Sequence, residues 1–544
     1  MMLPAEMNRR KIMGTSLGCL GFLLTDFLQL SSSAAARWRC KIRLSHFARG
    51  LIGWFMVVAL VTALPGKAAS ANEISHGKLG SGTSWETPWW IIDSGKPGAT
   101  VLLVGGMHGN EPAGFRAAEQ IRHWPIIRGK LLVLPKVNRL GLAANLRWAP
   151  EYRNDREKRD LNRNFPRDKG AAAITPLCQA IWAFVSRFQP EWVFDLHEGF
   201  DVHRINPKSV GSSIITFPGE ASFARIMLDA VNKGITPERH FSLLSRSGPV
   251  NGSLARACHR LLGAKSFILE TTSRDQPVSL RARQHRVMIS MAFLRLGMTD
   301  RDLRDVMGPR ALPGLTRVGV FDAAGANEAK VLKVIGEDRR FFACHVGPQD
   351  MSELGLQQFE VMVFPGGSGS KQGGAIGADG RENVRRFVRK GGGVVGICAG
   401  AYLCSSHYKW SLNLMNASVF NKMVEVKGRG RKSMWYRGKS TEVRVEFTDE
   451  GAALFGLEGT HSIRYHNGPI LSPGNTPSAP AYRALAFFRT ENGIYEAQKG
   501  TMIGAPAVVV SDFGKGKVLA ISPHFESTRG KEQAILKAID YVRR

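Results

Sequence analysis

The chain has 544 residues, 44% of them hydrophobic, and a formal net charge of +29. This length exceeds what one hydrophobic core normally serves, so a single-domain protein is excluded and two domains of ordinary size are expected. A strongly basic balance is common in proteins that bind nucleic acid or anionic membranes. Here the positive residues are scattered and no dense block dominates, so we expect no nucleic-acid partner.

The first 71 residues have the pattern of a targeting segment. Basic residues from Arg37 to Arg49 precede an apolar run, Leu51–Leu64, and the small residues Ala69, Ser70 and Ala71 follow. This order predicts a secretory signal, and hence a secreted or periplasmic protein. The apolar run is short for a membrane span. The alternative is an uncleaved N-terminal anchor that tethers the protein to a membrane.

Apolar runs alternate with amphipathic stretches through residues 85–305. The pattern predicts buried strands and helices in an α/β fold with a mostly parallel sheet. We expect a final helix to end near Met307 and the sequence "GPRALPG" to begin a new region, which gives a linker at 306–314. The expected strands lie within 99–106, 130–138, 191–198 and 266–272, and the expected helices near 112–124, 174–188 and 276–296.

Residue types that commonly bind zinc occur at the ends of two of these strands. In "VLLVGGMHGNEPAG" (101–114), His108 and Glu111 stand three positions apart, wrapped in glycines that allow a tight turn beside a ligand. His197 in "FDLHEG" follows another strand, and the carboxyl ends of strands in an open α/β sheet form its binding crevice. Two histidines and a carboxylate, with a position left for water, are a ligand set of catalytic zinc.

Four motifs in order, "HGNE", "RDLNRNFP", "DLHE" and "ILETT", resemble the zinc carboxypeptidase superfamily, and most of all its succinylglutamate desuccinylase/aspartoacylase branch. The resemblance implies one zinc per chain bound by His108, Glu111 and His197. It implies that Asp160 orients His108 from behind, and that Glu270 is the general base and acid.

The same resemblance implies a substrate with a carboxylate, either a small molecule or a peptide. Asn162 and Arg163 would hold that carboxylate. A second substrate arginine is expected upstream in "YRNDREKRD". Arg156 is our choice for it, with Arg147 and Arg153 left open.

A second α/β alternation runs through residues 315–544, with strands expected within 317–325, 359–367, 391–400 and 517–526. In "GGGVVGICAGAYL", Cys398 stands between an expected strand and an expected helix. The residues around Cys398 are small, as a strained nucleophile elbow requires. His524 and Glu526 follow the last strand, where an imidazole oriented by a carboxylate can take the thiol proton. Backbone N–H groups near Gly366 and Gly367 would serve an oxyanion.

The stretches "GICAGAYL", "YHNGP" and "SPHFE" resemble class I glutamine amidotransferase-like domains, in the form found at the N-terminus of some biotin–protein ligases. This implies a flavodoxin-like fold with a Cys–His–Glu triad. Phe525 stands where the amidotransferase pattern has proline, which puts glutamine hydrolysis in doubt. The sequence "KGRGRKS" (427–433) is similar to a loop of biotin-ligase catalytic domains, but a basic hairpin is the better interpretation.

The sequence therefore predicts two α/β domains, a zinc-carboxypeptidase-like mixed sheet at 85–305 and a flavodoxin-like amidotransferase domain at 315–544. We expect a zinc-dependent carboxypeptidase or N-acyl amino acid deacylase with a cysteine site attached. The alternatives are a non-catalytic, ligand-binding C-terminal domain, and a protein related to biotin ligases. The five cysteines from Cys178 onward are too widely spaced for a disulfide framework.

Overall fold

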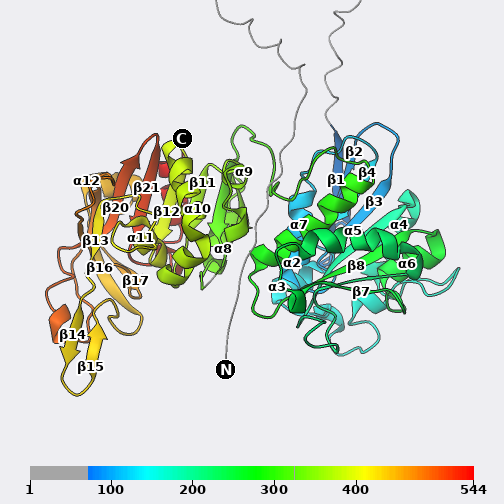
Figure 1. The fold of residues 1–544 in the computed structure, drawn as a ribbon, viewed down its shortest axis with the longest axis horizontal. Helices are drawn as coiled ribbons and strands as arrows, with labels where there is room; N and C mark the ends of the chain where they lie inside the picture. Colours follow the sequence, from blue (N-terminus) through cyan, green and yellow to red (C-terminus); the bar gives the residue numbers. More distant parts are fainter. Residues whose placement is uncertain (1–71, 324, 544) are drawn as a thin grey trace, which may run out of the picture. The chain divides into compact units, whose positions relative to one another are not determined.

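Two large mixed sheets, each with helices on both faces, make up the fold (Figure 1). The computed structural model describes residues 72–323 and 325–543. The predicted signal or anchor segment lies outside the described residues, as do Cys19 and Cys40. The expected α/β fold class, with two large mixed sheets, is confirmed.

The first sheet has the strand order β1-β2-β4-β3-β5-β8-β6-β7. Its centre, from β4 to β8, is parallel, while β1, β2 and the pairing of β6 with β8 are antiparallel. The strands are β1 (Glu73–Leu79), β2 (Thr87–Asp93), β3 (Thr100–Gly105), β4 (Lys130–Leu134), β5 (Trp192–Gly199), β6 (Ser213–Thr216), β7 (Ser242–Leu244) and β8 (Lys265–Thr272). The helices are α2 (Pro112–Ile121), α3 (Arg139–Ala144), α4 (Pro176–Phe188), α5 (Ala221–Asn232), α6 (Leu254–Leu262) and α7 (Val278–Arg295).

The direction of successive apolar side chains along β3 explains why helices cover this sheet on both faces. Val101 and Leu103 belong to one apolar cluster, with residues of α2, α5 and α7. Leu102 and Val104 belong to another, with residues of α4 and α6. Successive side chains of a strand point to opposite faces, so a continuous apolar run demands a layer of helices on each side.

One expected boundary is wrong. The last helix of the first half, α7, ends at Arg295 and does not continue to Met307. Gly297 has a φ of +66°, the left-handed conformation in which glycine commonly ends a helix. Residues 296–315 then contain turns and bends rather than helix.

The second sheet has the order β10-β9-β11-β12-β21-β20-β19-β16-β17. From β10 to β21 the strands are parallel, and the order β10-β9-β11-β12 is the flavodoxin-like one; β20, β19, β16 and β17 extend the sheet with antiparallel pairings. The strands are β9 (Thr316–Phe321), β10 (Phe341–Val346), β11 (Val361–Phe364), β12 (Gly393–Ile397), β16 (Thr441–Phe447), β17 (Thr460–Tyr465), β19 (Arg483–Phe488), β20 (Pro506–Phe513) and β21 (Gly516–Ile521).

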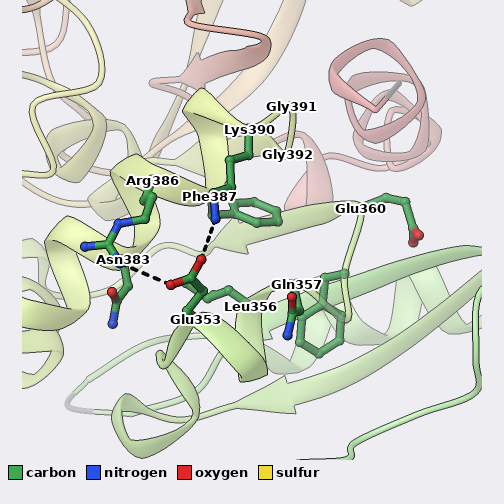
Figure 2. A pocket seen from close by; sticks show the side chains of 11 residues that line it. Glu353, Leu356, Gln357, Glu360, Asn383, Arg386, Phe387, Lys390, Gly391 and Gly392 are labelled. Carbon is green, nitrogen blue, oxygen red and sulfur yellow. Dashed lines mark hydrogen bonds and ion pairs between the residues drawn. The ribbon is translucent and has the colours of Figure 1, made fainter. Parts of the chain in front are cut away.

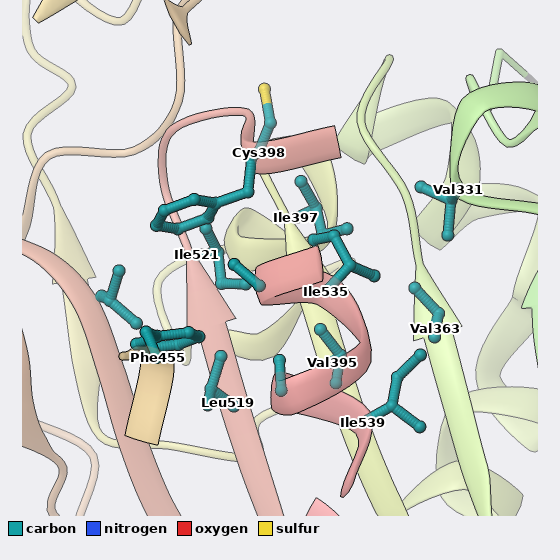
Figure 3. Packing of buried hydrophobic residues seen from close by; sticks show 14 of the residues in the cluster. Val331, Val363, Val395, Ile397, Cys398, Phe455, Leu519, Ile521, Ile535 and Ile539 are labelled. Carbon is teal, nitrogen blue, oxygen red and sulfur yellow. The ribbon is translucent and has the colours of Figure 1, made fainter. Parts of the chain in front are cut away.

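Helices cover this sheet on both faces as well. One apolar cluster joins the sheet to α8, α12 and α13, and Figure 3 shows part of it, with Ile535 and Ile539 against Val395 and Leu519. The other cluster joins it to α10 and α11. These helices are α8 (Ala329–Gly336), α9 (Glu353–Leu356), α10 (Gly369–Arg389), α11 (Ala399–Cys404), α12 (Asp449–Phe455) and α13 (Gln533–Val542).

Two small antiparallel pairs stand apart from the large sheets. One is β13 (Ala417–Val419) with β18 (Leu471–Pro473), and the other is β14 (Met423–Val426) with β15 (Gly430–Ser433). The second pair is the hairpin that "KGRGRKS" predicts. No helix of the described residues is both long and apolar enough to cross a membrane.

Candidate active sites

The predicted metal ligands come together at the carboxyl end of the first sheet. His108 lies in the turn after β3, Glu111 is the residue before α2, and His197 lies in β5. All three are buried, and one ligating atom from each can be chosen so that these atoms lie within 4.8 Å of one another. The turn needs glycine at position 109, since a Cβ there would stand 2.0 Å from the backbone of Gly141.

Both histidines turn their Nδ1 atoms toward Glu111. His108 Nδ1 lies 2.8 Å from Glu111 Oε1, and His197 Nδ1 lies 2.9 Å from Glu111 Oε2. The Nε2 atoms have carboxylate neighbours behind them: His108 Nε2 is 3.1 Å from Asp160, as predicted, and His197 Nε2 is 3.0 Å from Asp195. Such outer carboxylates fix the ring orientation and the tautomer of metal-binding histidines, so this geometry fits a metal ion.

Glu270 faces the same cluster from the neighbouring strand. In the parallel pairing of β5 with β8 it stands opposite His197. Its Oε2 is buried without a hydrogen-bond partner among the described residues. Burial raises the pKa of the Glu270 carboxyl to about 7, although the neighbouring His197 opposes that shift. A buried carboxyl that titrates near neutrality is suited to taking and returning a proton.

Cationic and amide side chains line the cavity around this cluster, which has a volume of about 540 Å³. Arg163 and Asn162, the residues predicted to hold a substrate carboxylate, both line it, and Asn162 Nδ2 lies 3.3 Å from His197 Nε2. Arg156, our choice for the second arginine, is exposed and is not among the lining residues. Arg147, which was left open, lines the cavity and contacts Glu111 Oε1 at 3.0 Å.

A loop after β5 forms one wall of the cavity and contains a further histidine, His203. His203 Nδ1 lies 2.7 Å from the carbonyl oxygen of Ser209, and the His203 N–H donates to Gly211. His203 therefore shapes the loop and does not belong to the cluster of candidate metal ligands His108, Glu111 and His197. The loop presents Phe200 and Lys208 to the cavity.

The residue predicted to be a nucleophile, Cys398, lies in a sharp turn of the second half. Cys398 stands between β12 and α11 with a φ of +50°, a strained conformation for a residue with a side chain. Small neighbours are required: a Cβ on Gly400 would lie 1.9 Å from the carbonyl oxygen of Phe364. Figure 3 shows Cys398 at the margin of the apolar cluster, with its sulfur pointing away from Ile397 and Ile521.

His524 and Glu526 lie beside this cysteine. His524 Nδ1 is 2.6 Å from Glu526 Oε1, while its Nε2 is buried without a hydrogen-bond partner in the described chain. Burial opposes protonation, but Cys398 and then Glu526 outweigh it and raise the pKa of His524 to about 10. A Cβ on Gly366 would stand 3.0 Å from the His524 ring and 3.7 Å from Cys398 Cβ, so the predicted oxyanion glycine is adjacent.

The other described cysteines have different surroundings. Cys178, Cys258, Cys344 and Cys404 are buried and unpaired. Burial raises the pKa of the Cys178 and Cys344 thiols to about 12 and raises those of Cys258 and Cys404 further. These four thiols are poor nucleophiles at neutral pH, because the thiolate is the reactive form.

A separate cavity of about 250 Å³ lies away from both sites (Figure 2). Its lining includes Glu360, just before β11, and Gly392, just before β12, so it opens at the amino ends of the strands whose carboxyl ends carry Gly366 and Cys398. Glu353 pairs there with Lys390 and Arg386. Because these charges satisfy one another, we assign the cavity no chemistry.

Family models match both halves of the chain. Residues 97–206 match "Succinylglutamate desuccinylase/Aspartoacylase catalytic domain", and residues 353–540 match "Biotin-protein ligase, N terminal". Both resemblances that the motifs predict are confirmed. A comparison with the curated proteins gives no match.

Solved structures similar to part of the chain include Csd4 of Helicobacter pylori, a D,L-carboxypeptidase in its mDAP-bound form. That structure shares 22% identity, covers 37% of this chain and 52% of its own, and gives a TM-score of 0.32. This chain thus spans about half the length of that relative. A succinylglutamate desuccinylase/aspartoacylase from Rhodobacter sphaeroides shares 17% identity, with coverages of 42% and 67% and a TM-score of 0.29.

Proposed function

We propose that the first half is a secreted, zinc-dependent hydrolase of an amide bond next to a carboxylate, either a carboxypeptidase or an N-acyl amino acid deacylase. The observation that carries this proposal is a cluster of buried side chains, His108, Glu111 and His197. These side chains line the same cavity as Glu270 and Arg163. The match of residues 97–206 to an amide-hydrolase catalytic family supports it.

Each residue has a role that follows from its position. His108, Glu111 and His197 would hold the zinc, which when bound polarises the scissile carbonyl and acidifies a water molecule. Glu270 takes the proton of the attacking water and returns it to the leaving nitrogen. Arg163 and Asn162 hold the substrate carboxylate, and Arg147 takes the place proposed for Arg156, because Arg147 lies in the cavity.

Arg163→Ala tests the substrate class. We expect kcat/KM to fall for amides that carry the carboxylate and to change little for matched amides without it. The fall should correspond to the loss of about 1.5–3 kcal/mol of binding free energy, the contribution of one charge-assisted hydrogen bond. The measurement is a panel of N-acyl amino acids and short peptides, each paired with its carboxamide. Arg156→Ala is the control and should leave both substrates unaffected. An equal loss on both members of each pair would contradict a carboxylate-binding role.

A second candidate function belongs to the second half, where Cys398, His524 and Glu526 would form a nucleophilic triad. The strained φ of Cys398 and the contact of His524 with Glu526 favour it. In this role the thiol attacks an acyl or amide carbonyl, His524 carries its proton, and backbone N–H groups at Gly366 and Gly367 stabilise the oxyanion. The alternative is a ligand-binding domain without catalysis.

Labelling with iodoacetamide at neutral pH separates these alternatives. We expect Cys398 to react before the other four described thiols, whose pKa values are raised by burial. His524→Ala should slow the labelling of Cys398, and Glu526→Gln should slow it less. Mass spectrometry of the digested protein gives each rate. If Cys398 in folded protein labels no faster than Cys404, the ligand-binding alternative is the better one.

A further inference from the structure

The β14–β15 hairpin carries a concentration of positive charge that neither candidate site uses. We call the segment 422–439 the basic hairpin. Glu425 is the one acidic residue in it. Figure 1 shows β14 and β15 extending beyond the strands of the second sheet, at the end of their half of the fold. Four cations stand at and near its tip: Lys427, Arg429, Arg431 and Lys432.

These cations are not neutralised by the protein. Across the described residues, none of the four has a carboxylate within ion-pair distance, and Arg431 stands opposite Glu425 in the ladder without such a contact. The four residues fall within six consecutive positions, 427–432, at and beside the turn between β14 and β15, so their positive charges are concentrated at one end of the hairpin. Their mutual repulsion is relieved when the tip meets a polyanionic surface.

Large apolar side chains are exposed on the same hairpin. Met423 is 50% exposed, Trp435 44% and Tyr436 40%. Beside them Ile494 is 47% exposed, and it lies so close that a Cβ on Gly438 would stand 2.8 Å from its side chain. Tryptophan and tyrosine next to lysine and arginine are typical of segments that lie in the headgroup region of a membrane.

Hydrogen bonds attach the base of the basic hairpin to the neighbouring loop, so the exposed groups stand on an ordered segment. Arg437 is 1% exposed, and its guanidinium donates to the carbonyl oxygen of Asn492 at 2.9 Å. Gln498 donates to the carbonyl oxygen of Tyr436 at 2.7 Å. Arg437 is thereby occupied inside the fold, which leaves the four tip cations and the apolar residues for a partner.

We propose that the basic hairpin docks the protein onto a bilayer that contains anionic phospholipids. The tip cations lie against the headgroups, and Trp435, Tyr436 and Met423 enter the interface. The apolar component favours a bilayer over nucleic acid, because the exposed aliphatic side chains of Met423 and Ile494 offer no face for base stacking. The proposal is independent of both candidate catalytic sites.

Co-sedimentation of the full chain with vesicles tests the proposal. The wild type should bind vesicles of phosphatidylcholine with phosphatidylglycerol more tightly than vesicles of phosphatidylcholine alone. Removing the four tip charges should weaken binding to the anionic vesicles by roughly several hundredfold, since each cation near such a surface contributes roughly fivefold and the four contributions multiply. The test variant combines Lys427→Gln, Arg429→Gln, Arg431→Gln and Lys432→Gln.

A matched variant separates docking by the hairpin from the effect of net charge. It removes four exposed cations elsewhere and should bind the anionic vesicles nearly as the wild type does; it combines Lys169→Gln, Arg225→Gln, Lys233→Gln and Arg260→Gln. Because every variant keeps the N-terminal segment, that segment cannot produce the difference. Equal losses in both variants, or undiminished binding by the tip variant, would overturn the proposal. So would a single-stranded oligonucleotide that outcompetes the vesicles for the tip.

Discussion

Glu270→Gln should retain its metal and lose at least about a hundredfold in kcat, the loss expected when a general acid/base is removed. The substitution keeps the size of the side chain but leaves it unable to take the proton of the attacking water. The pKa of Glu270 is raised by burial, and its Oε2 makes no hydrogen bond within the described structure, so the neutral amide should be tolerated in the fold. The measurement is kcat on the best amide substrate, with metal content determined on the same sample.

Metal content decides how a loss of activity is interpreted. If Glu270→Gln loses both activity and metal, the carboxylate supports the metal cluster and does not transfer protons. If kcat stays near the wild-type value, Glu270 has no part in the reaction. Thr271→Ser is a useful comparison, because it changes the next residue of β8 without touching the proposed base.

The motifs located most of the candidate metal site. In parallel strands the carboxyl ends meet at one edge of the sheet, so His108 and His197 could be brought together without a structure, while the role of Glu270 came from the family resemblance. Asp195 was missed although it was within reach. It stands two residues before His197 on β5, and alternate residues of a strand share a face, so it was the natural neighbour of the imidazole.

Arg147 could not be chosen from the sequence in the same way. It stands between α3 and the short helical turn Pro150–Tyr152, where no periodicity fixes the direction of a side chain. Arg156 was nearer to the "DLNRN" motif in the chain but is exposed in the fold. The choice between them depended on how an irregular loop returns to the sheet, which is set by tertiary packing.

The hydrogen-bond partner of Cys398 was likewise beyond the sequence. Small residues around Cys398 predicted a strained elbow, and Cys398 has a positive φ. The sequence did not indicate that Cys398 donates a hydrogen bond to the carbonyl oxygen of His466. That contact links the elbow to the loop after β17, which is far away in the chain.

His108→Ala should remove the metal and with it the amide hydrolysis. A catalytic zinc site has three protein ligands, and the loss of one leaves Glu111 and His197 to hold the ion alone. We expect the wild type to contain about one zinc per chain and the variant to contain almost none after dialysis against a weak chelator. Elemental analysis of both proteins, with circular dichroism to establish that the variant folds, gives the result.

Two further variants make this expectation specific to the proposed ligands. His203→Ala removes a histidine from the loop that forms one wall of the same cavity, but its Nδ1 contacts the carbonyl oxygen of Ser209, so the metal should remain. Asp195→Asn keeps His197 but weakens the contact that orients it, so affinity should fall roughly 10- to 100-fold. A His108–Glu111–His197 site requires a graded loss of metal affinity. The loss should be largest in His108→Ala, smaller in Asp195→Asn and absent in His203→Ala. Equal metal content in the wild type and His108→Ala would rule that site out.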